Sequence, residues 1–345
     1  MGLLGQHHTP IGIDVAGMCI TAAQLRRRGR YAPWEIVATA RYPRTQPDKP
    51  LDAAEIQRLR DVLRRQAFVG RDIVLAIPGS TLLASLVDAP PATSSAPIDT
   101  IVRNELAHAY DLGPETIEVA HWPLPESSEE CQEQRVMAVG CPHVSAENLI
   151  EMFESNGLRV HALDTKTWAI ARGLHGTATS EMVATLDIEW EAAVLGCLCN
   201  GLVHYERTVP NTGWKGLFET VTKETNVEDD ATRNYLIRSL TLGSGDGAAS
   251  TAIADVGDIR QKLVTQLDKL ANDVQESLTY VERLFPTTPV KRLCLVGGGV
   301  TIPGLASHLQ ERLQVETVTQ GSGTGPDAEM VPSIGLALYG EKIAA

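Results

Sequence analysis

The sequence has no long apolar run. None of its apolar segments reaches the ~18–20 residues that a helix needs to cross a bilayer. Residues 1–10 also lack the basic start and the long apolar core of a secretory signal. We therefore expect a cytoplasmic protein with no direct membrane insertion.

Basic residues are scarce. The 345 residues include 30 Lys and Arg against 43 Asp and Glu, which gives a formal net charge of −13. Nucleic-acid binding needs clustered positive charge, so this balance disfavours that class of function. One basic cluster, residues 26–30, contains a Gly and stands between two strand-like runs. We expect a solvated hairpin end there.

Cysteine pairs with metal-ligand spacing are also missing. Six Cys occur, but none forms a CxxC pair or a Cys/His cluster of the zinc-binding kind. Cys197 and Cys199 stand two apart in an apolar strand-like run, so they share one face. We expect buried thiols in a reducing compartment and no metal site.

The length and the 43% hydrophobic content suit a soluble protein of two or more domains. The first part reads as three strands, a helix and a buried strand; Asp52 and Glu55 are spaced as a capping box before the helix. Residues 86–160 read as a compact α+β unit that ends in a helix over 145–157.

The second part begins with the stretch LDIEWEAAVLG, residues 186–196, which predicts a strand, a tight turn and a second strand. Its turn has no Gly, Asn or Pro, the residues that favour tight hairpins. Residues 213–240 look helical, 241–257 read as a loop, and apolar spacing predicts a long helix over 258–285. A short apolar helix is expected within 331–345.

Gly297, Gly298 and Gly299 lie between an apolar strand and a helix. Such a turn lets the backbone approach a phosphate or nucleotide, although a plain strand–helix joint would look the same. Three segments occur along the chain in this order: IGIDVAGMCITAAQL, the stretch LDIEWEAAVLG that contains Asp187, and LVGGGVTIPGL. Together they resemble the actin-like ATPase superfamily, in which two Asp-containing hairpins clamp phosphates and metal.

Within this superfamily the chain is most similar to the PilM family of type IV pilus assembly proteins. GIDVAGMCITAAQL, IVLAIPGSTLLASLVDAP and LVGGGVTIPGLASHLQERLQVET carry the resemblance. It implies an α/β fold of two ribonuclease-H-like halves with a small inserted α+β subdomain. The first half covers 1–85 with 161–180 and 331–345, the insertion covers 86–160, and the second half covers 181–330, with 211–257 as its smaller helical subdomain.

The resemblance also implies nucleotide-binding residues, should that activity be retained: Gly12, Asp14, Gly17, Asp187, Gly297, Gly298 and Gly299. The chain departs from the family in both hairpins. After Asp14 no hydroxyl residue occurs before Thr21, and Glu189 stands where the family has Gly. A carboxylate beside a triphosphate repels it, and Trp190 would fill the space of a phosphate.

Two interpretations remain open. In the first, Glu189 or Glu191 is a metal ligand or general base for a changed reaction. In the second, the cleft has lost hydrolysis and the protein serves as a scaffold. We favour the scaffold, because no His or Lys near these hairpins in the sequence completes an enzyme. No catalytic residue, metal or cofactor is expected, and ATP with magnesium would bind weakly.

The family resemblance implies a partner: the N-terminal cytoplasmic peptide of a PilN-like inner-membrane protein, together with other pilus assembly proteins. The protein would then lie at the inner membrane through that partner. We assign the docking strand to Ser85, Leu86 and Val87, where an extended peptide could add to a sheet edge. Alternatives are an FtsA-like or secretion-system protein, or an active ATP-dependent kinase of the same superfamily.

Overall fold

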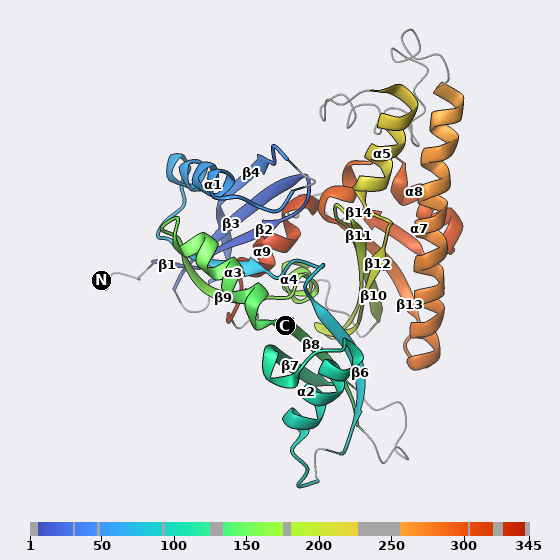
Figure 1. Ribbon diagram of the computed structural model, residues 1–345, viewed down its shortest axis with the longest axis horizontal. Coiled ribbons are helices and arrows are strands. Elements are labelled where there is room, and N and C mark those ends of the chain that lie inside the picture. Colours follow the sequence, from blue (N-terminus) through green and yellow to red (C-terminus); the bar gives the residue numbers. More distant parts are fainter. Residues whose placement is uncertain are drawn as a thin grey trace.

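The structure is a computed structural model that describes residues 6–29, 32–46, 49–91, 94–124, 134–174, 181–226, 256–302, 304–319 and 327–341 (Figure 1). Three mixed or antiparallel sheets organise it. The predicted helix beyond residue 226, most of the loop predicted over 241–257, Cys131 and the last residues from 342 lie outside the described residues.

The first sheet has the strand order β1-β3-β2-β5-β9, with β4 paired to β3. These strands are β1 (Gln6–His8), β2 (Ile11–Val15), β3 (Cys19–Arg28), β4 (Glu35–Pro43), β5 (Asp72–Ala76) and β9 (Arg159–Asp164). Helices α1 (Ala53–Arg65) and α3 (His143–Glu154) cover one face, where Ile56, Leu59 and Phe153 are fully buried. The other face receives α4 (Lys166–Gly173) and α9 (Val331–Ala337).

Half of the predicted capping box at α1 is present. Asp52 accepts a hydrogen bond from the Glu55 backbone N–H at 2.7 Å. The Glu55 carboxylate does not return to Asp52; it pairs with Arg44 at 3.0 Å and accepts from the Thr45 backbone N–H. A buried arginine is a stronger partner for a buried carboxylate than one amide, which explains the difference.

The second sheet has the order β12-β11-β10-β13-β14. Its strands are β10 (Met182–Ile188), β11 (Ala192–Cys199), β12 (Leu202–Pro210), β13 (Val290–Val296) and β14 (Glu316–Thr319). Helices α5 (Trp214–Thr225), α7 (Val256–Leu284) and α8 (Leu305–Leu313) lie along one face (Figure 1). The apolar stripe predicted for the long helix is buried here, from Ile259 to Val281.

The third sheet, β6-β8-β7, forms the inserted unit. It consists of β6 (Leu83–Ala89), β7 (Ile117–Pro123) and β8 (Gln134–Pro142), with α2 (Ile98–Ala109) and the short helix η1 (Pro114–Thr116). The unit therefore covers 83–142, which differs from the predicted 86–160. The helix predicted over 145–157 belongs to the first half instead, because Phe153 and Leu158 pack in the core of the first sheet.

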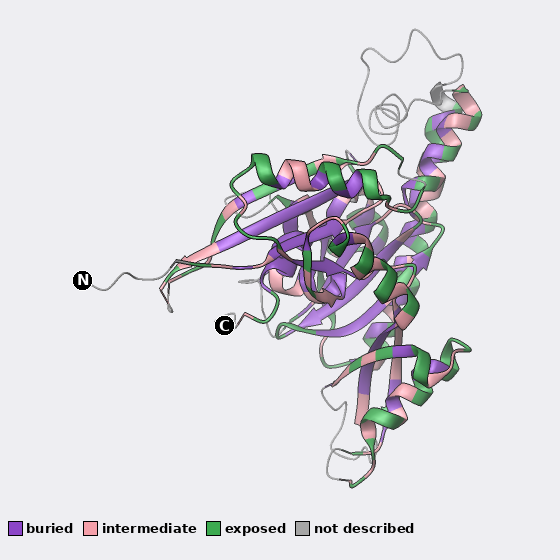
Figure 2. Ribbon diagram, turned by 60° about the vertical axis from the view of Figure 1, so that its left-hand side comes forward, coloured by how far each residue is buried: buried purple, intermediate pink, exposed green. Residues whose placement is uncertain are grey.

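Burial is concentrated on the strands of the two larger sheets (Figure 2). The five described cysteines are buried and form no disulfide with one another, as expected from their spacing. Among the described residues, the helices are not both long enough and apolar enough to cross a membrane. The helices α4 and α9 lie between the two larger sheets, since Ile170 and Val331 join the core that packs on β13.

Helices α4 and α9 pack with their backbones in direct contact. A Cβ on Gly335 would stand 1.6 Å from the Ala169 carbonyl oxygen, and one on Gly173 would stand 2.3 Å from the Val331 carbonyl oxygen. Gly12 of β2 makes the same kind of approach to α9, with the Ser333 carbonyl oxygen 2.0 Å from the added Cβ. Glycine at these positions sets where α4 begins relative to β2.

This packing predicts a strong effect of one methyl group. Gly335→Ala should lower the free energy of unfolding by about 3 kcal/mol, because rigid backbone stands in the way of the added Cβ. Urea unfolding followed by circular dichroism measures it. Gly216→Ala in α5 is the control, since its Cβ would meet only the end of the Gln266 side chain. That control should change stability by less than about 1 kcal/mol; equal effects would contradict the packing account.

Candidate functional site

The two predicted Asp hairpins face each other at the junction of the two halves. Asp14 lies on β2 opposite Thr21 of β3, and Asp187 lies on β10 between β11 and β13. Their exposed fractions are 3% and 2%. Each aspartate stands near the end of its strand, so both carboxylates reach the space between the sheets.

Lys166 occupies that space. Its Nζ lies 3.1 Å from Asp14 Oδ1, 3.0 Å from Asp187 Oδ2 and 2.5 Å from Glu189 Oε1. It is the first residue of α4, and Thr165 caps that helix by accepting from the Trp168 backbone N–H. One ammonium thus joins carboxylates from both halves of the molecule. We call Asp14, Lys166, Asp187 and Glu189 the lysine cluster.

Lys166 is charged in this setting. Burial opposes its charge, but the carboxylates of Asp14, Asp187 and Glu189 outweigh burial and raise the pKa of Lys166 well above 10.5. Burial also raises the pKa of Asp14, and raises the pKa of Asp187 to about 7, with Lys166 opposing and Glu189 adding to both shifts. Three carboxylates share one cation, so carboxyl groups outnumber the single ammonium group in the cluster.

The sequence reasoning did not find Lys166. Lys166 is far from both hairpins in the sequence, and β9 with α4 bring it between them. A signal was present: a lysine at the start of a helix opposes the helix dipole, so a local partner is required. Among the described residues, no group of three or more His, Cys, Asp or Glu is arranged to hold a metal.

The unusual turn after Asp187 is held by α5. The backbone N–H groups of Trp214 and Lys215 donate to the carbonyl oxygens of Glu189 and Trp190, at 2.9 and 2.8 Å. The start of a helix has unpaired N–H groups, and this turn supplies their acceptors. The turn therefore keeps its shape without the Gly, Asn or Pro that a free hairpin would use.

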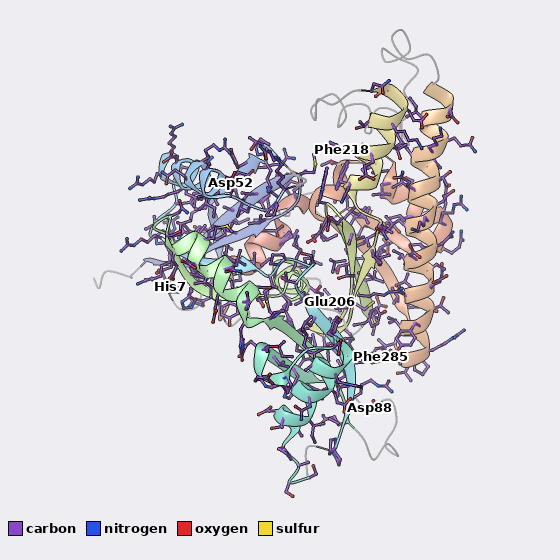
Figure 3. All side chains as sticks on the ribbon, in the orientation of Figure 1. His7, Asp52, Asp88, Glu206, Phe218 and Phe285 are labelled. Atoms are coloured by element: carbon purple, nitrogen blue, oxygen red, sulfur yellow. The ribbon has the colours of Figure 1, made fainter. Side chains whose placement is uncertain are left out.

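Trp190 covers the first hairpin. A Cβ on Gly17 would stand 2.1 Å from the Trp190 Cβ, so these two turns are in direct contact. The Trp190 ring packs edge-on against Phe218 of α5, with ring centroids 5.2 Å apart. The Trp190 side chain thus lies between the turn of the first hairpin and α5. Figure 3 labels Phe218 where α5 meets the second sheet.

The predicted glycines divide into two groups. Gly297 (φ +66°) belongs to the 3-10 turn η2 (Gly297–Thr301), and a Cβ there would stand 1.9 Å from Asp187 Oδ1. Gly298 and Gly299 follow in the same turn, and the Trp214 indole nitrogen lies 3.4 Å from a Cβ on Gly298. Gly12 is not in the site, because its open side faces α9.

Comparisons with known proteins point to one fold. No protein-family model and no curated protein sequence matches the chain. A solved PilM-PilN type IV pilus biogenesis complex matches with a TM-score of 0.76 at 20% identity, covering 96% of this chain and 98% of that chain. Ethanolamine utilization protein EutJ from Carboxydothermus hydrogenoformans follows at TM-score 0.56 and 15% identity, covering 98% and 92%.

MreB5 of Spiroplasma citri bound to AMPPNP matches at TM-score 0.55 and 12% identity, covering 96% of this chain and 95% of that chain. The chain has the actin-like ATPase fold. The fold class predicted from the sequence is confirmed, and the similarity to the PilM structure agrees with the resemblance noted in the sequence. In this actin-like fold, the lysine cluster lies where the two Asp hairpins meet.

The other predicted residues lie elsewhere. Ser85, Leu86 and Val87 are on β6, which pairs with β8 and, within the part of the chain that the structure describes, is an edge strand of the inserted sheet. The basic cluster ends the β3–β4 hairpin, as expected, but it is not simply solvated. Arg26 pairs with Glu35 at 3.3 Å, and the Arg27 guanidinium lies over the Trp34 ring.

A further acid, Glu206, was missed by the sequence reading. It lies on β12, is 6% exposed, and has no hydrogen bond of good geometry at either carboxylate oxygen. Burial raises its pKa to about 7; the Thr167 hydroxyl lowers this pKa in part and the Glu189 charge raises it further. The sequence signal is weak: Glu206 is one of several polar residues in the strand LVHYERTVP.

The lysine cluster predicts the effect of removing its cation. Lys166→Met should lower the free energy of unfolding by about 3–5 kcal/mol at pH 8, because the buried carboxylates of Asp14 and Asp187 and the partly exposed one of Glu189 then lack a partner. The loss should be smaller at pH 5, because burial raises the pKa of Asp14 and of Asp187, so these two groups take up protons as the pH falls. Lys215→Met is the control: this surface lysine pairs with Glu191 and should contribute about 0–1 kcal/mol. A loss equally small for both variants would contradict the cluster.

Burial of Glu206 predicts that replacing it with Gln raises the stability of the fold in a pH-dependent way. The folded state holds a proton on Glu206 up to about pH 7, while the unfolded chain releases it near 4.5, so stability falls as pH rises between these values. Glu206→Gln has no charge to bury. Its free energy of unfolding should therefore exceed that of the wild type by about 3 kcal/mol at pH 8.5 and equal it below pH 4.5. Urea unfolding at both pH values measures this. An advantage independent of pH would contradict the buried-charge account.

Proposed function

We propose that the chain is a PilM-like assembly protein that docks the N-terminal cytoplasmic segment of a PilN-like membrane partner. The observation that carries the proposal is the match to the PilM-PilN complex over nearly the full length of both chains, at a TM-score of 0.76. The protein would lie at the cytoplasmic face of the inner membrane through that partner. Other pilus assembly proteins would join the same assembly.

The free edge of β6 supports docking by strand addition. The Tyr110 hydroxyl accepts from the Ala84 backbone N–H at 3.0 Å and donates to its carbonyl oxygen at 2.9 Å, so these groups point away from β8. Backbone groups of alternate residues face the same edge of a strand. Those of Leu86 therefore face outward as well, one step beyond the tyrosine, where an incoming strand could pair with them.

The nucleotide cleft is proposed to be degenerate. The space between the two Asp hairpins is filled by the Lys166 side chain, and the carboxylates around it already have that cation. Glu189 adds a negative charge that repels phosphate, and Trp190 covers Gly17. These contacts disfavour an active kinase, since phosphoryl transfer needs a preorganised clamp for the phosphates. We assign no catalytic residue, and weak binding of ATP with magnesium stays within the proposal.

The docking part is tested with synthetic peptides. N-terminal cytoplasmic segments of single-span proteins encoded near this chain are titrated against the full chain by fluorescence anisotropy. One PilN-like segment should bind in the micromolar range. Leu86→Pro should abolish this binding by removing an outward N–H, whereas Leu86→Ala keeps the N–H and should retain it. Absence of binding by every segment would contradict the docking proposal, and equal loss in both variants would contradict the strand-addition geometry.

The cleft part is tested by restoring small residues. The double variant Glu189→Gly with Trp190→Ser should bind ATP with magnesium at least tenfold more tightly than the wild type in calorimetric titration. The reason is that it removes the excess acid and the covering ring. Glu191→Gly is the matched control, because it removes an exposed acid from the same turn. No gain in the double variant, or the same gain in the control, would contradict the proposed cause.

A further inference from the structure

Positive charge is unevenly distributed along this acidic chain. Residues 1–85 contain 12 Lys and Arg against 7 Asp and Glu, whereas residues 86–345 contain 18 against 36. The first 85 residues therefore carry a net positive charge, although the net charge of the whole chain is −13. Such an asymmetry indicates that one surface of the molecule meets a polyanion.

The positive charge gathers at the end of the first sheet that lies opposite to Asp14. Asp14 is near the last residue of β2, so the other end of the sheet is where β2 begins. Strands β5 and β9 are parallel to β2 and begin at the same end. Strand β3 is antiparallel to β2 and ends there at Arg28, where it pairs with β1. Figure 1 shows β1 at this end, and Figure 3 labels His7 there.

Helix α1 brings further arginines to the same end. The loop after α1 is held against β3, because the Gln24 side chain donates to the Val69 carbonyl oxygen and accepts from the Val69 backbone N–H, both at 2.8 Å. Arg64 and Arg65 are in the last turn of α1. Arg71 directly precedes β5, and its carbonyl oxygen accepts from the first backbone N–H of β9 at 2.8 Å. Segments far apart in the sequence thus present arginines side by side.

Four exposed arginines of this end form no ion pair with another described residue, and we call them the arginine surface: Arg28, Arg64, Arg65 and Arg71. Three acids there are already bound to other arginines, in the pairs Arg26–Glu35, Arg27–Glu341 and Arg159–Asp72. Asp61 of α1 and Glu154 of α3 are also near this end, but neither lies within ion-pair distance of the arginine surface. The four guanidinium groups are therefore available to an anion from outside.

Apolar side chains are exposed beside these charges. Val69, in the loop between α1 and β5, is 53% exposed, and Ile36 of β4 is 45% exposed. Trp34 is partly buried and lies beneath the Arg27 guanidinium, which is 4.5 Å from the centre of its ring. Arginine, tryptophan and aliphatic side chains occur together where a protein contacts lipid headgroups. A purely ionic partner, such as nucleic acid, would gain nothing from the exposed Val69 and Ile36.

We propose that the arginine surface rests on an anionic lipid membrane, at the depth of the headgroups and without insertion of a segment. An arginine held near an anionic leaflet strengthens binding by about fivefold. The acidic remainder of the chain is repelled by the same lipid, so the contact also orients the molecule. The choice of lipid among polyanions rests on the proposed function, which places the chain beside a membrane partner.

The contact works together with that partner. A few surface charges give only weak attachment, which salt screens. A partner anchored in the membrane holds the chain close to the leaflet, so that binding of the arginine surface becomes intramolecular. The two contacts therefore strengthen each other, although each can be measured alone.

Vesicle sedimentation with the full chain tests the contact. The wild type should bind vesicles of phosphatidylglycerol and phosphatidylcholine in equal parts, should not bind vesicles of phosphatidylcholine alone, and should be released by salt at about 0.5 M. The variant with Arg28→Gln, Arg64→Gln, Arg65→Gln and Arg71→Gln should bind the anionic vesicles at least thirtyfold more weakly, because it lacks all four charges.

The matched control carries Arg260→Gln, Lys269→Gln, Arg283→Gln and Lys291→Gln, which remove four exposed cations of the second half. It has the same net charge as the first variant and should bind within about threefold of the wild type. Urea unfolding checks that both variants fold as the wild type does. Equal losses in the two variants would overturn the proposal, as would a wild type that does not bind the anionic vesicles.

Two further titrations separate lipid from other polyanions. Fluorescent polyglutamate represents an acidic protein, and a short DNA duplex represents nucleic acid. Binding of either one that is tighter than vesicle binding, and that is lost in the variant of the arginine surface, would assign the surface to that macromolecule and overturn the lipid proposal.

Failure of this inference and failure of the proposed function are distinguishable. A PilN-like segment that binds in solution, with no binding of the wild type to anionic vesicles, keeps the function and overturns the inference. Binding to anionic vesicles through the arginine surface, with no binding of any PilN-like segment, does the reverse.

Discussion

The ammonium of Lys166 is the interaction on which the centre of the molecule depends. It joins Asp14 of the first sheet to Asp187 of the second sheet and to Glu189 in the turn that follows Asp187. Buried ion pairs contribute little when they form, but a buried charge that loses its partner costs several kcal/mol. The cluster therefore resists separation of the two hairpins more than it stabilises the fold. Its excess acid also makes the same space unfavourable for phosphate.

The other features of the site follow from this arrangement. Glu189 can occupy its turn because the start of α5 holds the turn backbone, and Trp190 can lie on Gly17 because that residue has no side chain. Gly297 approaches Asp187 so closely that any side chain would displace the carboxylate. The glycine turn has a role in packing here, whether or not a nucleotide approaches it. The side chains of the lysine cluster thus connect the two halves of the described molecule.

The sequence predicted the fold well because strand and helix periodicity, and the order of two Asp hairpins and a glycine turn, are local signals. The sequence alone predicts that Asp14, Asp187, Glu189 and Gly297 share one site. Lys166 and Glu206 were missed for the same physical reason: each acts through contacts made across the junction of the halves, and no local pattern encodes such a contact. The predicted boundary of the inserted unit also differs from the structure, because α3 follows the inserted strands in sequence but packs on the first sheet.

The central claim is that Lys166 stays in the carboxylate cluster and that nucleotide phosphates do not replace it. The most direct measurement follows the Cε resonance of Lys166 by NMR, assigned with Lys166→Met, while ATP and magnesium are added to millimolar concentration. The account predicts that this resonance does not change when nucleotide is added. It also predicts that the resonance titrates only well above pH 10.5. A shift that saturates with nucleotide, or a lysine that loses its proton near neutral pH, would contradict it.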